Sequence, residues 1–152
     1  MQRFRIGAIT DEFSPSIEVA AESMAKLGME VAELRMVFDK NIVDLRNDEI
    51  ERAKQVLADR GLTIVSIASP LLKCTLPDAP DVDSRFQQDM FASKHNFEDQ
   101  PRLTSRAFEI AERTGAKIVR VFSYWRTVEP EKVFERVVSA LRSLAGQAAG
   151  RG

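Results

Sequence analysis

Four consecutive residues combine two aromatic rings with a hydroxyl group and a guanidinium: Ser123, Tyr124, Trp125 and Arg126. Aromatic faces pack against the apolar C–H surface of a sugar ring, and an arginine binds oxyanions through two parallel hydrogen bonds. We therefore predict that Ser123, Trp125 and Arg126 bind substrate. The alternative is that Tyr124 and Trp125 only cover the rim of the fold.

Two charged residues are further candidates for contacts with a ligand. Glu33 can accept hydrogen bonds from ligand hydroxyl groups, or it can form an ion pair with Arg5, Arg35 or Arg120. A buried carboxylate needs such a partner, because leaving it unpaired costs on the order of several kcal/mol. Lys73 can bind a phosphate or another ligand oxygen as a flexible point charge, or it can be an exposed loop lysine.

His95 is the only histidine of the chain. Histidine transfers protons near neutral pH and often binds metals, so His95 is a candidate substrate-binding residue. The alternative is a histidine on a surface loop or at a helix cap. One histidine without a second histidine or a cysteine beside it does not make a metal site, so we assign no metal ligand. The catalytic residues stay unassigned.

The only cysteine, Cys74, excludes an internal disulfide and a zinc site built from several thiolates. Lys73 is its only neighbour in the sequence that would lower the pKa of the thiol. We therefore expect Cys74 to be chemically inert.

The helices and strands that must position these residues follow a repeated sequence pattern. In each repeat, a helical segment ends at a glycine, and a short run rich in β-branched residues follows. Gly28, Gly61 and Gly115 end the first three helices, because glycine adopts the left-handed conformation without a Cβ penalty. The predicted strands are residues 4–10, 29–34, 62–68 and 116–122. The predicted helix starts are Ser14-Pro15, Asn47, Pro101 and Glu129-Pro130. This βα order predicts a parallel sheet with right-handed crossovers.

The predicted helices each have an apolar face. The first is formed by Ile17, Ala20, Ala21, Met24 and Leu27, and the second by Ile50, Ala53 and Leu57. The third is formed by Leu103, Ala107, Ile110 and Ala111, and the fourth by Val133, Val137, Leu141 and Leu144. Such faces are typical of helices that pack on one side of a sheet.

Alternate positions of the predicted strands differ in polarity. One set is apolar and is expected to face the helices: Ala32, Leu34, Val65, Ile67, Val119 and Val121. The opposite set is polar: Arg5, Glu33, Arg35, Ser66 and Arg120. A polar inner surface favours a (β/α)8 barrel over a flavodoxin-like open sheet, which has helices on both faces. Ligands bind a barrel at the strand C-terminal ends, where Asp11 and Glu12 also line the mouth unless Asp11 only shapes the turn.

The fold class predicted is therefore α/β, with residues 1–152 forming the N-terminal four βα units of a (β/α)8 TIM barrel. The interval between Gly61 and Gly115 is the longest, because a loop of residues 72–96 follows the third strand. Gly152 stands where the repeat would start a fifth strand, so we expect the chain to be truncated before that strand.

The amino-acid composition excludes some classes of binding partner. The chain has 152 residues, with 22 Lys and Arg against 23 Asp and Glu, a net charge of −1. This balance and a pI near 5.9 predict no binding to nucleic acid or to an anionic membrane. No apolar run reaches the roughly 20 residues of a membrane span, and the N-terminus has no signal-peptide pattern. We expect a cytoplasmic protein.

Four segments at matching strand ends resemble sugar phosphate isomerases/epimerases with the xylose isomerase-like TIM barrel. They are residues 6–13 (IGAITDEF), 31–35 (VAELR), 66–70 (SIASP) and 119–126 (VRVFSYWR). The resemblance implies aldose–ketose isomerisation or epimerisation by proton transfer next to a carbonyl, a sugar or sugar phosphate as ligand, and a divalent metal (Mn, Mg, Co or Zn). It also supports Glu33 as an acceptor for substrate hydroxyl groups.

The chain departs from that family in its metal ligands. In the family, two Glu, one Asp and one His on the later strands bind the metal, and those positions are not in this sequence. The resemblance therefore implies no metal site on this chain alone, and an isolated chain without activity.

Other interpretations stay open. Inosose dehydratases and apurinic endonucleases belong to the same superfamily, although only His95 is present for the additional zinc sites of the endonucleases. A further alternative is a non-catalytic half-barrel that associates with itself, because its first and fourth strands expose unpaired edges. We accordingly expect a homo-oligomer.

Overall fold

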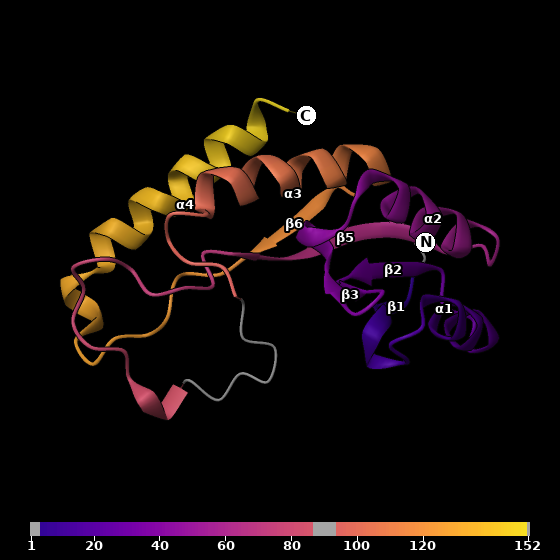
Figure 1. The fold of residues 1–152 in the computed structure, drawn as a ribbon, viewed down its shortest axis with the longest axis horizontal. Helices are drawn as coiled ribbons and strands as arrows, with labels where there is room; N and C mark the ends of the chain where they lie inside the picture. Colours follow the sequence, from indigo (N-terminus) through magenta and orange to yellow (C-terminus); the bar gives the residue numbers. More distant parts are fainter. Residues whose placement is uncertain (1–3, 87–93, 152) are drawn as a thin grey trace. The chain divides into compact units, whose positions relative to one another are not determined.

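The computed structural model describes residues 4–86 and 94–151. Its main sheet has the strand order β1-β2-β5-β6 (Figure 1). The strands are β1 (Gly7–Ile9), β2 (Val31–Leu34), β5 (Thr63–Leu71) and β6 (Ile118–Val121). The helices between and after them are α1 (Ile17–Lys26), α2 (Asn47–Ala58), α3 (Gln100–Thr114) and α4 (Phe134–Ala149). The predicted βα alternation is confirmed.

The sheet is parallel, as predicted. β1 pairs with β2, and β2 with β5, in parallel register. Along β5 and β6 the hydrogen bonds advance in the same direction on both strands: the N–H of Lys117 donates to Val65, and the N–H of Phe122 donates to Leu71. Parallel strands place their C-terminal ends at one edge of the sheet.

The chain divides into two compact units. Unit 1 comprises residues 1–69 and 106–120, and unit 2 comprises residues 70–105 and 121–152. The division falls within β5, α3 and β6, so the ends of these strands and the first turns of α3 belong to unit 2.

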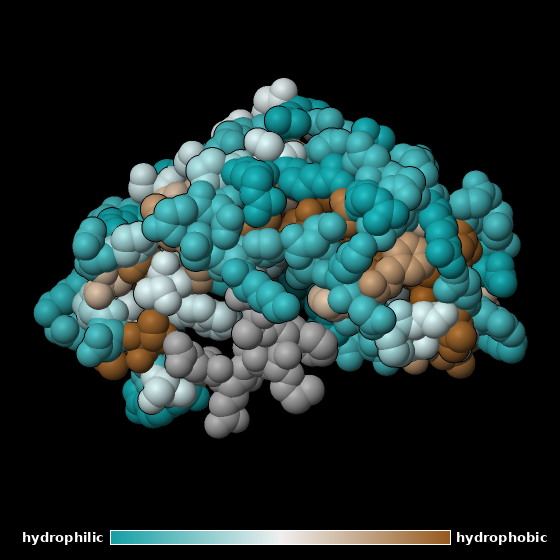
Figure 2. All heavy atoms as spheres, viewed as in Figure 1, coloured by the Kyte–Doolittle hydropathy of each residue, from teal (hydrophilic) through white to brown (hydrophobic). Residues whose placement is uncertain are grey.

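The core of unit 1 consists of the inner faces of its helices against the sheet. The fully buried large side chains there include Ile17, Met24, Leu34, Ile50, Leu57, Ile67 and Ile110. The predicted faces of α1, α2 and α3 are confirmed, except that Leu27 is 68% exposed because it is the C-cap residue of α1. On α4 of unit 2, Val133 and Leu144 are buried, while Val137 and Leu141 are half-buried. Figure 2 shows mostly hydrophilic residues over the visible surface of α3.

The predicted helix starts need correction by a few residues. Ser16, not Ser14, caps α1, because its hydroxyl accepts a hydrogen bond from the N–H of Val19. Asn47 is already inside α2, and its carboxamide oxygen accepts from Arg106 instead of capping the helix. Pro130 opens the 3-10 turn η4 (Pro130–Lys132), and α4 follows at Phe134. The three helix-ending glycines do have positive φ, as predicted.

The strands also differ from the prediction. β1 is shorter than residues 4–10, and β5 extends beyond residue 68 to Leu71. The register between β2 and β5 shifts after Ala32, so that Ala32 pairs with Ile64 but Glu33 pairs with Ser66. A bulge of this kind interrupts the strict alternation of faces. Accordingly Ile64, Ser66 and Ile67 are all buried. On β6, Val121 is 36% exposed, although the strand pattern predicts that helices cover it.

A hairpin of two short strands was not predicted. β3 (Met36–Val37) pairs antiparallel with β4 (Lys40–Asn41). The two residues of its turn, Phe38 and Asp39, have φ of 52° and 58°. Positive φ at both turn residues is the geometry of a tight two-residue hairpin, which these non-glycine residues do not signal in a sequence.

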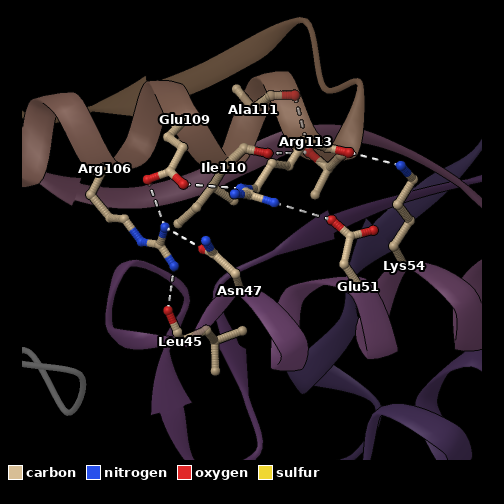
Figure 3. Close-up of polar contacts among 10 residues, drawn as sticks. Leu45, Asn47, Glu51, Lys54, Arg106, Glu109, Ile110, Ala111 and Arg113 are labelled. Atoms are coloured by element: carbon tan, nitrogen blue, oxygen red, sulfur yellow. Dashed lines mark hydrogen bonds and ion pairs between the residues drawn. The ribbon is translucent and has the colours of Figure 1, made fainter.

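A polar network joins α2 and the later part of α3 within unit 1 (Figure 3). Arg106 donates to the backbone carbonyl of Leu45 and to the side chain of Asn47, and it pairs with Glu109. Lys54 of α2 donates to the carbonyl of Arg113 at 2.8 Å. These contacts fix the position of α3 against α2. Among the residues that the structure describes, no helix has the length and apolar character to cross a membrane.

Candidate functional site

Two cavities lie in unit 2, beyond the C-terminal ends of β5 and β6. The strand-end cavity, of about 460 Å³, is lined by Lys73, Val121, Phe122, Ser123, Tyr124, Trp125 and Leu141. The loop cavity, of about 560 Å³, is lined by Lys73, Cys74, Thr75, Pro77, Trp125 and residues 94–98. Lys73 and Trp125 line both cavities. Four of the six predicted substrate-binding residues, Lys73, His95, Ser123 and Trp125, line one cavity or both.

Backbone hydrogen bonds position these side chains after the strands have ended. The two segments that follow β5 and β6 remain paired: the N–H groups of Phe122, Tyr124 and Trp125 donate to the carbonyls of Leu71, Leu72 and Cys74 at 2.8, 2.9 and 3.0 Å. This pairing places Ser123 and Trp125 beside Lys73.

Left-handed backbone at two non-glycine residues allows this pairing. Leu72 has φ of 58° and Tyr124 has φ of 65°. Such conformations cost on the order of 1 kcal/mol or more each and persist where the surroundings enforce them. Strained residues of this kind cluster at functional sites. Here Leu72 directly precedes Lys73, and Tyr124 directly precedes Trp125.

Gln100, the first residue of α3, is a positioning residue that the sequence analysis missed. Its side chain is buried, accepts a hydrogen bond from the N–H of Leu72 at 2.8 Å and donates to the carbonyl of Asn96 at 2.8 Å. It therefore connects the end of β5 to the loop that carries His95. No pattern in the sequence distinguishes it from an exposed glutamine at a helix start.

Lys73 is 8% exposed, which contradicts the alternative of an exposed loop lysine. Its Nζ lies 5.1 Å from the centre of the Phe122 ring, within the range of a cation–π interaction. The ammonium group thus lies in a partly aromatic environment, where its charge interacts more strongly with a ligand than it would in water.

His95 and Trp125 are only partly accessible. The side chain of His95 is 14% exposed, and its Nδ1 lies 4.0 Å from the Asp99 carboxylate. Trp125 is half-buried, and Ser123 is exposed at the strand-end cavity. Arg126 is exposed and lines neither cavity, while its backbone carbonyl accepts a hydrogen bond from the N–H of Asp83.

Glu33 belongs to unit 1. It is half-buried, and no hydrogen bond or ion pair joins its carboxylate to another residue in the described ranges 4–86 and 94–151. The ion pair that was offered as its alternative role is therefore not found. Its carboxylate stays a candidate for substrate hydroxyl groups.

Arg35 binds Asp11 and Glu12 instead of Glu33. Its Nε and Nη2 donate to the Asp11 carboxylate at 2.9 and 2.7 Å, and the N–H of Met36 donates to the other carboxylate oxygen. Burial disfavours the charged guanidinium, but the hydrogen bonds and charges of Asp11 and Glu12 outweigh burial and raise the pKa of Arg35. Asp11 thus shapes the turn, the second of the roles considered for it.

Cys74 lines the loop cavity, and burial, followed by the charge of Glu98, raises the pKa of its thiol to about 11. The thiol is protonated at neutral pH and does not act as a nucleophile there.

The described residues do not fit the divalent metal that the family resemblance implies. In residues 4–86 and 94–151, no group of three or more His, Cys, Asp or Glu side chains converges on one point. The expectation that the chain alone binds no metal stays a prediction: calorimetry with Mn²⁺ or Zn²⁺ should detect no stoichiometric micromolar site, and such a site, lost on mutation of residues in this chain, would contradict it.

Comparison with known proteins identifies the fold. No protein-family model and no curated protein sequence matches the chain. Several solved structures match it, two of them as follows. A xylose isomerase domain protein from Planctomyces limnophilus matches over 98% of this chain, with 12% identity and a TM-score of 0.57. D-psicose 3-epimerase from Clostridium cellulolyticum H10, crystallised with D-tagatose, also matches over 98% of this chain, with 15% identity and a TM-score of 0.60. The chain spans about half the length of each, 51% and 50%. It therefore has the fold of half of a xylose isomerase-like TIM barrel.

Proposed function

We propose that the chain is part of a sugar or sugar phosphate isomerase/epimerase, to which it contributes part of the substrate-binding rim. The observation that carries this proposal is the pair of cavities at the C-terminal ends of β5 and β6, which share Lys73 and Trp125. In TIM-barrel enzymes, substrates bind at this edge of the sheet. The fold likeness to an epimerase with a bound ketose supports the same reaction class, proton transfer next to a carbonyl.

Three of the lining residues have a defined task in this proposal. The Trp125 ring packs against the C–H face of the sugar and excludes water from it. The ammonium group of Lys73 and the hydroxyl group of Ser123 bind sugar oxygens. The acid–base residues of the reaction are not assigned to this chain.

Saturation-transfer NMR with a neutral ketohexose such as D-tagatose tests the proposal. We expect saturable transfer to the sugar protons with the unmodified chain, and loss of most of it in Trp125→Leu. Phe134→Leu is the matched control, because Phe134 is 60% exposed and lines neither cavity. Absence of saturable binding, or equal transfer in Trp125→Leu and the unmodified chain, overturns the proposal.

A second candidate function is a non-catalytic half-barrel that associates with itself. It is favoured by apolar side chains of unit 1 that are exposed at and beside the two outer strands: Phe4 at 92%, Ile6 at 66% and Ile118 at 58%. Exposed apolar side chains next to unpaired strand edges favour pairing with another chain.

A further inference from the structure

Part of the wall of the loop cavity is a short segment of unit 2 whose two ends are fixed by backbone hydrogen bonds. This segment, residues 75–80, contributes two residues to the lining and is called the wall loop below. Just before it, the carbonyl of Cys74 accepts a hydrogen bond from the N–H of Trp125 at 3.0 Å. Just after it, the carbonyl of Asp81 accepts one from the N–H of Val128 at 2.9 Å. The ends of the wall loop are therefore attached to one continuous stretch of chain.

The middle of the wall loop is bound by a side chain of α4. Nη2 of Arg136 donates to the carbonyl of Pro77 at 2.6 Å, and Nη1 donates to the carbonyl of Asp78 at 3.4 Å. Arg136 is 59 and 58 positions away from these two residues in the sequence. In Figure 1 the segment after β5 passes beside the first turns of α4, where these contacts form. Pro77, the residue with the shorter contact, lines the loop cavity together with Trp125.

The backbone conformation at Asp78 suits this contact. Asp78 has φ of 51°, in the left-handed region. In a left-handed turn successive carbonyls point to the same side, whereas in extended backbone they alternate, so one guanidinium reaches both carbonyls here. A non-glycine residue in this region costs on the order of 1 kcal/mol and persists where its surroundings enforce it. The two hydrogen bonds from Arg136 are such an enforcing contact.

Arg136 also lies close to the strand-end cavity. Burial, followed by the charge of Cys74, raises the pKa of Tyr124, and the positive charge of Arg136 opposes this increase. A charge has this effect only where it lies near the titrating hydroxyl group, and Tyr124 lines the strand-end cavity. Arg136 itself lines neither cavity, so it acts on the site through its neighbours.

We infer that Arg136 is a positioning residue of the candidate site, because its hydrogen bonds to the carbonyls of Pro77 and Asp78 keep the wall loop beside Trp125. The inference rests on the proposed function for the nature of the ligand, whereas the contact between α4 and the wall loop does not depend on it. Arg136 is exposed, so its removal should change the shape of the site much more than the stability of the chain.

The single tryptophan of the chain allows a test without any ligand, because Trp125 lines both cavities. Arg136→Met releases the middle of the wall loop. We expect acrylamide to quench the fluorescence of Trp125 about twofold more efficiently in this variant than in the unmodified chain. The unfolding midpoint in urea should stay close to that of the unmodified chain.

Three further variants identify the contact responsible. Arg142→Met is the matched control, because Arg142 is an exposed arginine of the same helix that lines neither cavity. Asp78→Asn removes the carboxylate but keeps a residue that tolerates positive φ, so it should leave quenching unchanged if Arg136 acts on the backbone carbonyls. Arg136→Lys keeps the charge and one donor without the fork of the guanidinium, so its quenching should lie between those of Arg136→Met and the unmodified chain.

Saturation-transfer NMR with D-tagatose links the wall loop to ligand binding. Arg136→Met should weaken binding of D-tagatose about threefold, because the wall of the cavity beside Trp125 is no longer fixed. Arg142→Met should bind D-tagatose as the unmodified chain does.

The outcomes separate this inference from the proposed function. Equal quenching in Arg136→Met and Arg142→Met overturns the inference, whether or not the chain binds a sugar. Increased quenching with unchanged affinity for D-tagatose also overturns it, as does a large fall in the unfolding midpoint of Arg136→Met. If quenching rises in Arg136→Met while the unmodified chain binds no ketohexose, the proposed function fails and the positioning of the wall loop by Arg136 is supported.

Discussion

Gly7 of β1 lies opposite Val31 of β2 in the parallel pairing. A Cβ atom on Gly7 would lie 2.1 Å from the carbonyl oxygen of Val31 and 2.5 Å from its Cγ2. Because backbone cannot move aside as a flexible side chain can, Gly7→Ala should destabilise the fold by about 1–3 kcal/mol. Urea unfolding measures the change.

The control for this substitution is Gly146→Ala in α4. No atom lies within 4 Å of the added Cβ there, and alanine favours helix, so stability should rise by about 0.5–1 kcal/mol. An unfolding midpoint of Gly7→Ala equal to that of the unmodified chain would show that β1 does not approach β2 this closely.

Cys74 leads to a prediction about pH. Burial raises the pKa of its thiol from 9.0 to about 11, so alkylation of the native chain at pH 8 should be much slower than in urea. As pH rises, the Cys74 thiol loses its proton at a lower pH in the unfolded chain than in the folded chain, because its pKa is lower there. The stabilising contribution of the protonated thiol is therefore complete below pH 9 and is lost as pH rises towards 11.

Alkylation rates measured with and without urea across this pH range check the prediction. A native thiol that reacts at pH 8 as fast as the unfolded one contradicts it. Cys74→Ser serves as the blank for reaction at other groups.

At the scale of elements, Arg106 joins α3 to the start of α2 (Figure 3). Its guanidinium is 17% exposed and binds the Leu45 carbonyl, the Asn47 side chain and Glu109. Removing it leaves a partly buried carbonyl without its charged donor. We expect Arg106→Ala to lower the free energy of unfolding by about 1.5–3 kcal/mol.

Arg102→Ala on the same helix is the matched control. Arg102 is 60% exposed, and within the described part of the chain its ion-pair partner is Asp99 at 3.2 Å, so its loss should change stability by less than about 1 kcal/mol. Equal effects of the two substitutions in denaturant titrations would mean that the α2–α3 contacts add no stability.

At the scale of the whole molecule, the exposed apolar side chains of unit 1 lead to a prediction about association. Burying Phe4, Ile6 and Ile118 together with the unpaired strand edges favours contact with a second chain over solvation. Light scattering at micromolar concentration should therefore detect oligomers.

Charged substitutions at these positions should oppose association. Ile6→Lys and Ile118→Lys are expected to shift the population towards monomer, because a lysine on an exposed edge disfavours strand pairing. A monodisperse 17.1 kDa species of the unmodified chain, with cooperative unfolding, would refute the self-association hypothesis.

The sequence by itself determined the order of strands and helices, the helix-ending glycines and most of the buried helix positions. These features depend on local periodicity and on the conformational freedom of single residues. Gly28, Gly61 and Gly115 have positive φ as predicted, and Ile110 and Leu57 are fully buried as predicted. The identity of four βα units follows from such local signals alone.

Only the tertiary structure decided which polar groups meet. Arg35 and Asp11 are 24 positions apart, and Arg35 binds Asp11 and not Glu33, although it was one of three possible ion-pair partners of Glu33. Likewise, the burial of Lys73 and the left-handed backbone at Leu72 and Tyr124 depend on the pairing of the segments after β5 and β6. In each case, residues that are distant in the sequence compete to form the same hydrogen bonds or ion pairs. The fold that forms is the one in which most buried polar groups have a hydrogen-bond partner, and local sequence patterns do not reveal these partners.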